Sequence, residues 1–320
     1  MRLSEIFIVL LFGIVEGITE WLPISSTGHM LLLQDFIPLD VSGDFWNMFL
    51  VVIQLGAILS VVVLFWKKIC PFSTTQSGII PQKIYLQKSI LQLWLKVFVA
   101  VLPAIIIGLP FDDIIENLFY TPLMVALMLI IYGIIFILIE WHCRKKQFTI
   151  TDLSQLNYKA ALMIGIFQVL ALIPGTSRSG ATIIGAMLLG ATREVAAEFT
   201  FYLAIPVMAG ASLLKLVKFG FAFSSIEIVV LLTGMLSAFI VSMFTIQFLM
   251  RYVKSHNFKP FGYYRILLGV IILLLKCRFH LILLYFALCK IAFSSGILYV
   301  SAVLQKGHLT SIGLPSSIIS

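Results

Sequence analysis

The stretch EGITEWLPISSTGH, residues 16–29, interrupts an apolar segment of residues 5–33 with two acids, a proline and four hydroxyl side chains. A second stretch, PGTSRSG at residues 174–180, interrupts the apolar segment 160–190 in the same manner. Backbone that faces lipid cannot leave its polar groups unpaired, so a break at membrane depth implies surrounding protein or a water-filled cavity. Each segment is therefore predicted to form a re-entrant helix–turn–helix hairpin whose inner helix N-terminus faces an anion.

The composition places the whole chain in a membrane. Of its 320 residues, 61% are apolar and 11% are charged, and the mean hydropathy is +1.09. A soluble domain carries roughly 45–50% apolar and about 25% charged residues, so this chain cannot bury its apolar surface in one globular core. A cytosolic enzyme, a secreted disulfide scaffold and a disordered tail are excluded. The four cysteines have no paired spacing that would indicate a disulfide framework or a zinc site.

Six apolar runs are long enough, or nearly so, to cross a bilayer as helices of about 20 residues. They are residues 45–66, 91–110, 121–141, 198–219, 226–250 and 262–276. The N-terminal segment is not read as a signal peptide, because two glutamates interrupt it and no A-x-A site follows. Several polar residues near span ends are expected to be ordinary boundary residues: Glu140, Trp141, Lys215, Lys218 and Arg265.

The two hairpins match each other at a shift of 152 residues. This shift lays Ser25 on Ser177, and it pairs Gly13 with Gly165, Glu16 with Gln168, Ser26 with Arg178, Thr27 with Ser179 and Gly28 with Gly180. Each half then contains one hairpin and three spans. Because three is odd, the second half enters the membrane from the opposite side, which defines an inverted repeat. The expected fold is an all-α polytopic membrane protein with six spans and two re-entrant hairpins, in one domain of residues 1–276 with repeat halves of about 1–141 and 155–276.

The net charge of +8 is explained better by membrane topology than by a nucleic-acid partner, because the basic residues lie between apolar runs. The expected topology gathers the cations on one side: Lys67, Lys68, Lys83, Lys88, Arg144, Lys145, Lys146, Lys159, Arg193, Arg251, Lys254 and Lys259. The other side collects mainly acids: Asp35, Asp40, Asp44, Asp112, Asp113 and Glu116. By the positive-inside rule the first side is cytoplasmic, so the N-terminal hairpin is expected to open outward.

Glu16 and Glu20 are four residues apart and so share one face of a helix. Two carboxylates on one face repel unless a cation lies between them or one is protonated. A hard divalent cation such as Mg²⁺ suits oxygen ligands and a phosphate partner. The alternative is a pair of carboxylates at a solvated helix end, close to the break at Pro23.

Ser25, Ser26 and Thr27 precede His29, and a hydroxyl near an imidazole resembles a nucleophile with its base. Read alone, however, this stretch is explained better as an ordinary helix N-cap.

The second hairpin favours a functional site over the N-cap interpretation. Arg178 stands among the hydroxyls of Thr176, Ser177 and Ser179 at a new helix N-terminus, where backbone N–H groups and a guanidinium fork suit phosphate oxygens. The structural alternative for Arg178 is a buried ion pair with Glu16 or Glu20 that locks the two hairpins together. The residue Glu198 is ambiguous between a cavity-lining and a helix-starting position.

The two motifs resemble the bacterial undecaprenyl-diphosphate phosphatase family, which is linked to bacitracin resistance. The resemblance extends over residues 1–276 and includes IQLGA at 53–57, LPA at 102–104 and FGYYR at 261–265. It implies a multi-pass enzyme of the bacterial inner membrane that removes the terminal phosphate of a C55 lipid diphosphate. This reaction regenerates the lipid carrier for peptidoglycan precursors. The resemblance also implies a divalent cation, Mg²⁺ or Ca²⁺.

Carried over residue by residue, the resemblance implies that Glu16 and Glu20 hold the metal or a water molecule. Ser26 would be a candidate nucleophile, with His29 as base, acid or rival nucleophile, and attack by water stays open. Arg178 would grip the diphosphate. The remaining hydroxyls would assist in phosphate binding: Ser25, Thr27, Thr176, Ser177 and Ser179.

Three further points stay open at the level of the sequence. Residues 277–320 extend beyond the usual end of the family and could be a seventh span, a surface helix or an unselected extension. A homodimer is one option for the oligomeric state. A transporter or flippase for lipid phosphates could use the same inverted repeat and Arg178, but it would not need two acids, a serine and a histidine around one phosphate. A structural scaffold would leave these polar side chains unexplained.

Overall fold

A computed structural model of the chain describes residues 3–74, 84–144, 146–220 and 222–276. The described residues are helical, apart from loops and one two-stranded antiparallel hairpin in which Phe72 pairs with Leu86. The elements, in chain order, are α1 (Leu3–Thr19), α2 (Ser26–Phe36), α3 (Gly43–Val52), α4 (Gln54–Leu64), α5 (Trp66–Ile69), β1 (Phe72–Thr74), β2 (Ile84–Leu86), α6 (Lys88–Phe119), α7 (Pro122–Cys143), η1 (Leu153–Gln155), α8 (Tyr158–Val169), η2 (Leu170–Leu172), α9 (Arg178–Leu188), α10 (Arg193–Phe219) and α11 (Ser225–Ser255). A further helix covers residues 259–276.

Five helices in the described chain are long and apolar enough to cross a membrane: Gly43–Leu64, Lys88–Phe111, Pro122–Cys143, Arg193–Phe219 and Ser225–Ser255. Each coincides with one of the predicted spans, so the prediction of an all-helical, multi-pass membrane protein is confirmed at this level. Large apolar side chains on these helices are exposed, among them Phe98, Ile131 and Phe244, as expected of surfaces that face lipid. The run 262–276 is helical as well, but the number of spans stays a prediction.

Both interrupted segments fold as helix–turn–helix hairpins. In the first, α1 ends at Thr19 and α2 begins at Ser26; in the second, η2 ends at Leu172 and α9 begins at Arg178. The residue before each inner helix has a positive φ, 75° at Ser25 and 71° at Ser177. Among the described residues no other side-chain-bearing residue has a positive φ. Such backbone costs about 1–3 kcal/mol and is typical of functional sites.

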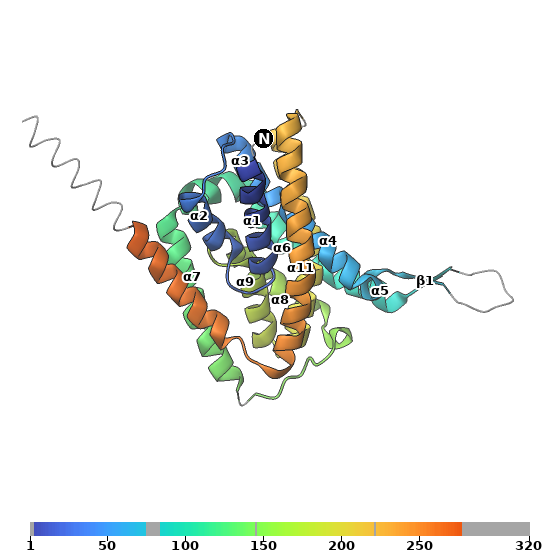
Figure 1. The fold of residues 1–320 in the computed structure, drawn as a ribbon. Helices are drawn as coiled ribbons and strands as arrows, with labels where there is room; N and C mark the ends of the chain where they lie inside the picture. Colours follow the sequence, from blue (N-terminus) through green and yellow to red (C-terminus); the bar gives the residue numbers. More distant parts are fainter. Residues whose placement is uncertain (1–2, 75–83, 145, 221, 277–320) are drawn as a thin grey trace, which may run out of the picture. The chain divides into compact units, whose positions relative to one another are not determined.

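Glycines allow each hairpin to pack closely on a long helix. A Cβ at Gly13 of α1 would lie 2.6 Å from the carbonyl oxygen of Gly234 in α11, and a Cβ at Gly165 of α8 would lie 2.3 Å from that of Ala100 in α6. Figure 1 shows α1 alongside α11. Small residues at such contacts let two backbones approach where the hydrophobic effect cannot drive association.

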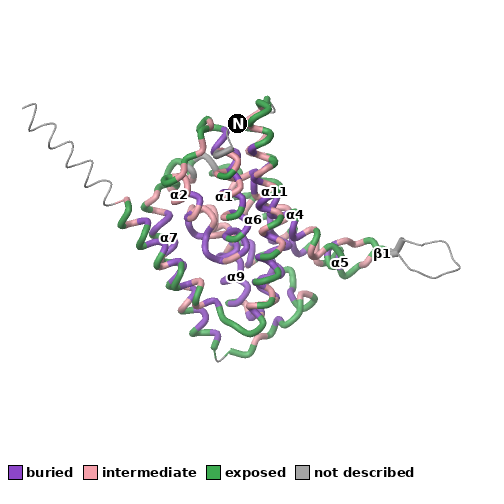
Figure 2. Tube along the Cα trace, viewed as in Figure 1, coloured by how far each residue is buried: buried purple, intermediate pink, exposed green. Residues whose placement is uncertain are grey.

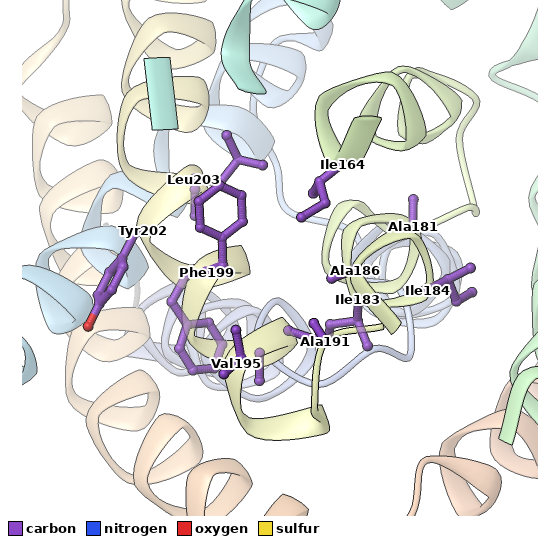
Figure 3. Packing of buried hydrophobic residues seen from close by; sticks show 14 of the residues in the cluster. Ile164, Ala181, Ile183, Ile184, Ala186, Ala191, Val195, Phe199, Tyr202 and Leu203 are labelled. Carbon is purple, nitrogen blue, oxygen red and sulfur yellow. The ribbon is translucent and has the colours of Figure 1, made fainter. Parts of the chain in front are cut away.

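The inner helix of the second hairpin lies in the centre of the main packed cluster. Residues 179–187 of α9 are all buried, and Figure 2 shows this helix largely in purple. Its Ala181, Ile183 and Ala186 belong to one apolar cluster with Ile164 of α8 and Phe199 of α10 (Figure 3). The second hairpin is therefore held by packing on both sides.

Glu140, expected at a helix boundary, and Glu198, expected either to line a cavity or to start its helix, are both buried and paired. Glu140 at the end of α7 is 3% exposed and accepts hydrogen bonds from both Nε and Nη2 of Arg193 and from the backbone N–H of Phe258. Glu198 accepts from Lys68 at 2.7 Å and from the Tyr202 hydroxyl. The prediction for Glu140 was wrong, because its partners come from other parts of the chain.

The chain divides into two compact units, Met1–Ile272 and Leu273–Ser320. All the hairpin residues lie in the first unit. The predicted extension, residues 277–320, lies outside the described residues.

Candidate functional site

The two hairpin breaks contact each other directly. Ser179 Oγ, at the start of α9, donates a hydrogen bond of 3.1 Å to the backbone carbonyl of Glu20, which follows α1. Arg178 Nη2 donates to Glu20 Oε1 at 3.2 Å. The structure thus brings together residues that are 158 and 159 positions apart in the sequence.

Arg178 is fixed by more than its ion pair. Its Nη1 donates to the backbone carbonyl of Thr200 at 3.0 Å, and its guanidinium lies 6.0 Å from the ring centre of Trp21. The side chains of Arg178 and Glu20 are 12% and 9% exposed. The structural alternative, a buried ion pair between the hairpins, is present with Glu20 as the partner of Arg178. At this burial the pair also holds the guanidinium in a fixed position at the break.

Ser26 hydrogen-bonds to the carboxylate and not to the histidine. Its Oγ donates to Glu20 Oε2 at 2.8 Å. Glu20 therefore holds Ser26 with one oxygen and Arg178 with the other. A carboxylate within hydrogen-bond reach of a hydroxyl meets the geometric requirement for a general base.

His29 is turned toward other partners. Its Nδ1 lies 2.7 Å from the carbonyl oxygen of Ser25, which can only accept, so this nitrogen carries a proton. Its Nε2 lies 2.7 Å from the hydroxyl of Tyr264, and the two rings stack with an angle of 6° between their planes. Both ring nitrogens of His29 are therefore occupied, and Ser26 relies on Glu20.

Several buried polar atoms around the breaks have no hydrogen-bond partner among the described residues. They include Glu16 Oε1, Ser25 Oγ and Thr176 Oγ1, on side chains that are at most 1% exposed. Buried polar groups are hydrogen-bonded in most proteins, and those left unpaired mark functional or ligand positions. These three atoms belong to residues predicted to bind metal or phosphate.

Glu16 and Glu20 can supply some, but not all, of the oxygen ligands that a divalent cation requires. In the described chain there is no cluster of three or more His, Cys, Asp or Glu side chains that could hold a metal alone. Mg²⁺ bound with phosphates commonly uses one or two carboxylates and takes its other oxygens from substrate and water. Glu16 and Glu20, with the unpaired Oε1 of Glu16, fit that kind of donor set.

The helix N-termini at the two breaks differ. Ser25 precedes α2 but forms no side-chain capping hydrogen bond, whereas Ser177 accepts from the backbone N–H of Gly180 at 3.2 Å. Reading the first break as an ordinary N-cap is therefore wrong. Since the Ser25 side chain does not cap the first turn of α2, the N–H groups of that turn can bind an anion.

A cavity of about 220 Å³ opens beside both breaks. Its lining includes Thr27 from α2, Pro174 from the second break and Lys215 from α10. A second cavity of about 500 Å³ lies between α6 and α10 and has an entirely apolar lining. Leu172, next to the second break, lines both cavities.

The sequence did not predict the contacts that the helix of residues 259–276 makes with the site. Arg265 is 0% exposed, so the expectation of an ordinary boundary residue was wrong. Tyr264 contacts His29. An arginine near the start of an apolar run was the available clue, because charge at membrane depth indicates function. Trp141 is 70% exposed, and its place at the membrane boundary stays a prediction.

The helices define a multi-pass membrane protein, and the two hairpin breaks form a buried polar site within it. The model of the family "Bacitracin resistance protein BacA" matches residues 9–271. The chain belongs to this family.

This chain aligns with nearly the whole length of several curated relatives. An "Undecaprenyl-diphosphatase" from Acetivibrio thermocellus is 59% identical over 84% of this chain and 97% of its own length. A protein with the same name from Enterococcus faecalis is 57% identical, covering 85% and 97%. "Undecaprenyl-diphosphatase 1" from Clostridium acetobutylicum is 56% identical, covering 85% and 98%.

Proposed function

We propose that this protein hydrolyses undecaprenyl diphosphate to undecaprenyl phosphate and inorganic phosphate. The reaction recycles the lipid carrier for peptidoglycan synthesis and gives resistance to bacitracin. The relatives carry the name of this activity at 56–59% identity. The observation that carries the proposal in the structure is Glu20, which binds a hydroxyl with one carboxylate oxygen and a guanidinium with the other.

In the proposed reaction, Arg178 and the first-turn N–H groups of α2 bind the terminal phosphate, assisted by Thr27, Thr176 and Ser177. Ser26 Oγ attacks the terminal phosphorus while its proton passes to Glu20. The bond from that phosphorus to the bridging oxygen then breaks. Undecaprenyl phosphate leaves and takes up the proton from Glu20. Water then cleaves the phosphoserine and releases inorganic phosphate. Arg178 stabilises the charge on the transferred group, which is the main contribution of a protein to phosphoryl transfer.

The proposed cofactor is Mg²⁺ or Ca²⁺, held by Glu16 and Glu20 together with phosphate oxygens. A bound divalent cation would neutralise phosphate charge. The unpaired Oε1 of Glu16 supports this role. His29, whose ring is oriented by Ser25 and Tyr264, is assigned the later proton transfer to or from the phosphate.

The prenyl chain of the substrate is proposed to lie in the apolar cavity between α6 and α10. Its lining includes Ala104, Gly108 and Gly210, whose lack of bulky side chains leaves room for a branched hydrocarbon. Leu172 lines both this cavity and the smaller one beside the breaks. In this proposal, a diphosphate bound beside the breaks extends its prenyl chain toward the apolar cavity.

The proposed architecture is an inverted repeat of one re-entrant hairpin and three spans in each half. Two observations support it. The positive-φ serines, Ser25 and Ser177, lie 152 residues apart, the same shift that aligns the motifs. Gly13 and Gly165, which this shift also aligns, make equivalent close contacts with α11 and α6.

The protein is proposed to reside in the bacterial inner membrane, with its site open to the extracytoplasmic side. This assignment follows from the distribution of Lys and Arg between loops. The homodimer stays a prediction.

The decisive experiment is phosphate release from a C55 or C15 prenyl diphosphate by purified protein, with and without EDTA. We expect release that stops on chelation and returns with Mg²⁺ or Ca²⁺. Release that ignores EDTA would move Glu16 and Glu20 to a purely acid–base role. Folded protein that releases nothing would favour the transporter instead.

A further inference from the structure

Arg265 lies between the two hairpin breaks and donates hydrogen bonds to both. Its Nη1 donates to the carbonyl of Pro23 in the first break at 3.2 Å. Its Nη2 donates to the carbonyls of Gly175 and Thr176 in the second break, at 2.8 and 2.7 Å. One side chain from the helix of residues 259–276 thus bridges two loops that are about 150 residues apart in the sequence.

Burying the charge of Arg265 costs free energy, and a packing role alone would not require a charged side chain. Burying a charge without a carboxylate partner costs several kcal/mol, and no carboxylate in the described chain forms an ion pair with Arg265. Its guanidinium instead lies 5.6 and 5.9 Å from the ring centres of Tyr132 and Phe136 on α7. A Cβ at Gly180 would lie 3.0 Å from Nη1, so the start of α9 leaves room for this group.

Tyr264, the residue before Arg265, contacts His29. The Tyr264 hydroxyl is hydrogen-bonded to His29 Nε2, and its ring stacks on the imidazole at 5.5 Å between centres. Two consecutive residues of one helix therefore contact the first break, the second break and the histidine. Figure 1 shows this helix, in orange, alongside α7.

We propose that Tyr264 and Arg265 are positioning residues: Arg265 fixes the two breaks relative to each other, and Tyr264 fixes the ring of His29. Neither residue is assigned contact with the reacting phosphate. The rigid fork of a guanidinium can donate to several carbonyls at once, which a lysine ammonium cannot do with the same geometry. The inference rests on the proposed function, since it supposes that the two breaks act on one phosphate.

The test compares Arg265→Lys and Tyr264→Phe with the matched control Tyr263→Phe in full-length protein. Tyr263 is the neighbouring tyrosine on the same helix and is 59% exposed. Hydrogen exchange is measured on peptides covering residues 22–28 and 173–180, and kcat and KM are measured with a C15 prenyl diphosphate.

For Arg265→Lys we expect faster exchange in both peptides together. We also expect kcat to fall on the order of 10²-fold, the effect of displacing catalytic groups by about 1 Å, with little change in KM. Tyr264→Phe should lower kcat several-fold without changing exchange at residues 173–180. Tyr263→Phe should match the wild type in every measurement.

Exchange that changes at one break only, or at neither, would overturn the role of Arg265. Unchanged kcat in Tyr264→Phe, or an equal loss in Tyr263→Phe, would overturn the role of Tyr264. If the wild-type protein released no phosphate, the proposed function would fail, while the exchange measurements would still decide whether Arg265 holds both breaks.

Discussion

The two hairpins have the same backbone and different chemistry. Each breaks before an inner helix at a serine with positive φ, and each packs through a glycine on a long helix. The first carries Glu16, Glu20 and Ser26, whereas the second carries the cation Arg178. A repeated architecture supplies the hairpin geometry twice. The side chains can then diverge, so that one half is acidic and nucleophilic and the other half binds anions.

The largest expected effect comes from removing the charges that join the two hairpins. Glu20→Ala and Arg178→Ala should each lower kcat by about 10³–10⁵-fold, the range for a transition-state arginine. The double variant should be little worse than either single variant, because partners that act as a unit are not additive. Phosphate release at saturating substrate measures this, with elution from a sizing column as the check on folding. Near-normal turnover in either single variant would contradict the site.

The next effect separates the hydroxyls of the first hairpin. Ser26→Ala should lower kcat on the order of 10²–10⁴-fold, because the variant loses the proposed nucleophile together with its proton transfer to Glu20. Thr27→Ala should lower it far less, since Thr27 lines the cavity and donates no proton to Glu20 in the structure. Single-turnover phosphate release compares the two. If both variants behaved alike, water or His29 would be the better candidate for the nucleophile.

Glu16 and its counterpart Gln168 give a contrast between function and stability. Both are buried with unpaired polar atoms. Glu16→Gln should raise the Mg²⁺ concentration for half-maximal activity by at least about tenfold. Loss of an outer-shell partner alone lowers metal affinity by about that factor, and Glu16 is a proposed direct ligand. Gln168→Glu should destabilise the fold by about 3–5 kcal/mol, because it buries an uncompensated charge.

Metal titrations and thermal unfolding in detergent measure these two outcomes. A stable Gln168→Glu variant would mean that a cation already lies near the second hairpin.

The smallest effect concerns the backbone at the breaks. Ser25→Gly should stabilise the protein by about 1 kcal/mol, since glycine removes the cost of the positive φ and the Ser25 hydroxyl has no partner. Ser177→Gly should gain less, because it also loses a cap worth about 1 kcal/mol. Thermal unfolding of the two variants side by side tests the difference. An equal gain in both would show that the Ser177 cap contributes nothing.

Local patterns in the sequence predicted much of the structure. The apolar runs predicted five of the long helices, and the clusters around Pro23 and Pro174 predicted both breaks. Charge at membrane depth also indicated that Glu20 and Arg178 would meet. These features depend on composition, spacing and the cost of burying a charge, all of which are visible along the chain.

Contacts that depend on three-dimensional packing were not predictable in this way. The choice of Glu20 over His29 as the partner of Ser26 is set by how α2 rotates at its first turn. The burial of Arg265 depends on where the helix of residues 259–276 docks, and the Pro23 carbonyl that Arg265 contacts is 242 residues away in the sequence. Spacing on one helix cannot reveal a partner on another.

The hydrogen bonds of Arg265 have a consequence for how the protein is made. Synthesis runs from the N-terminus, so both breaks leave the ribosome well before the residue that joins them. Until Arg265 arrives, the carbonyls of Pro23, Gly175 and Thr176 lack their guanidinium donor. The finished site therefore forms late in biosynthesis, and a nascent chain that stops short of residue 265 would enter the membrane without it.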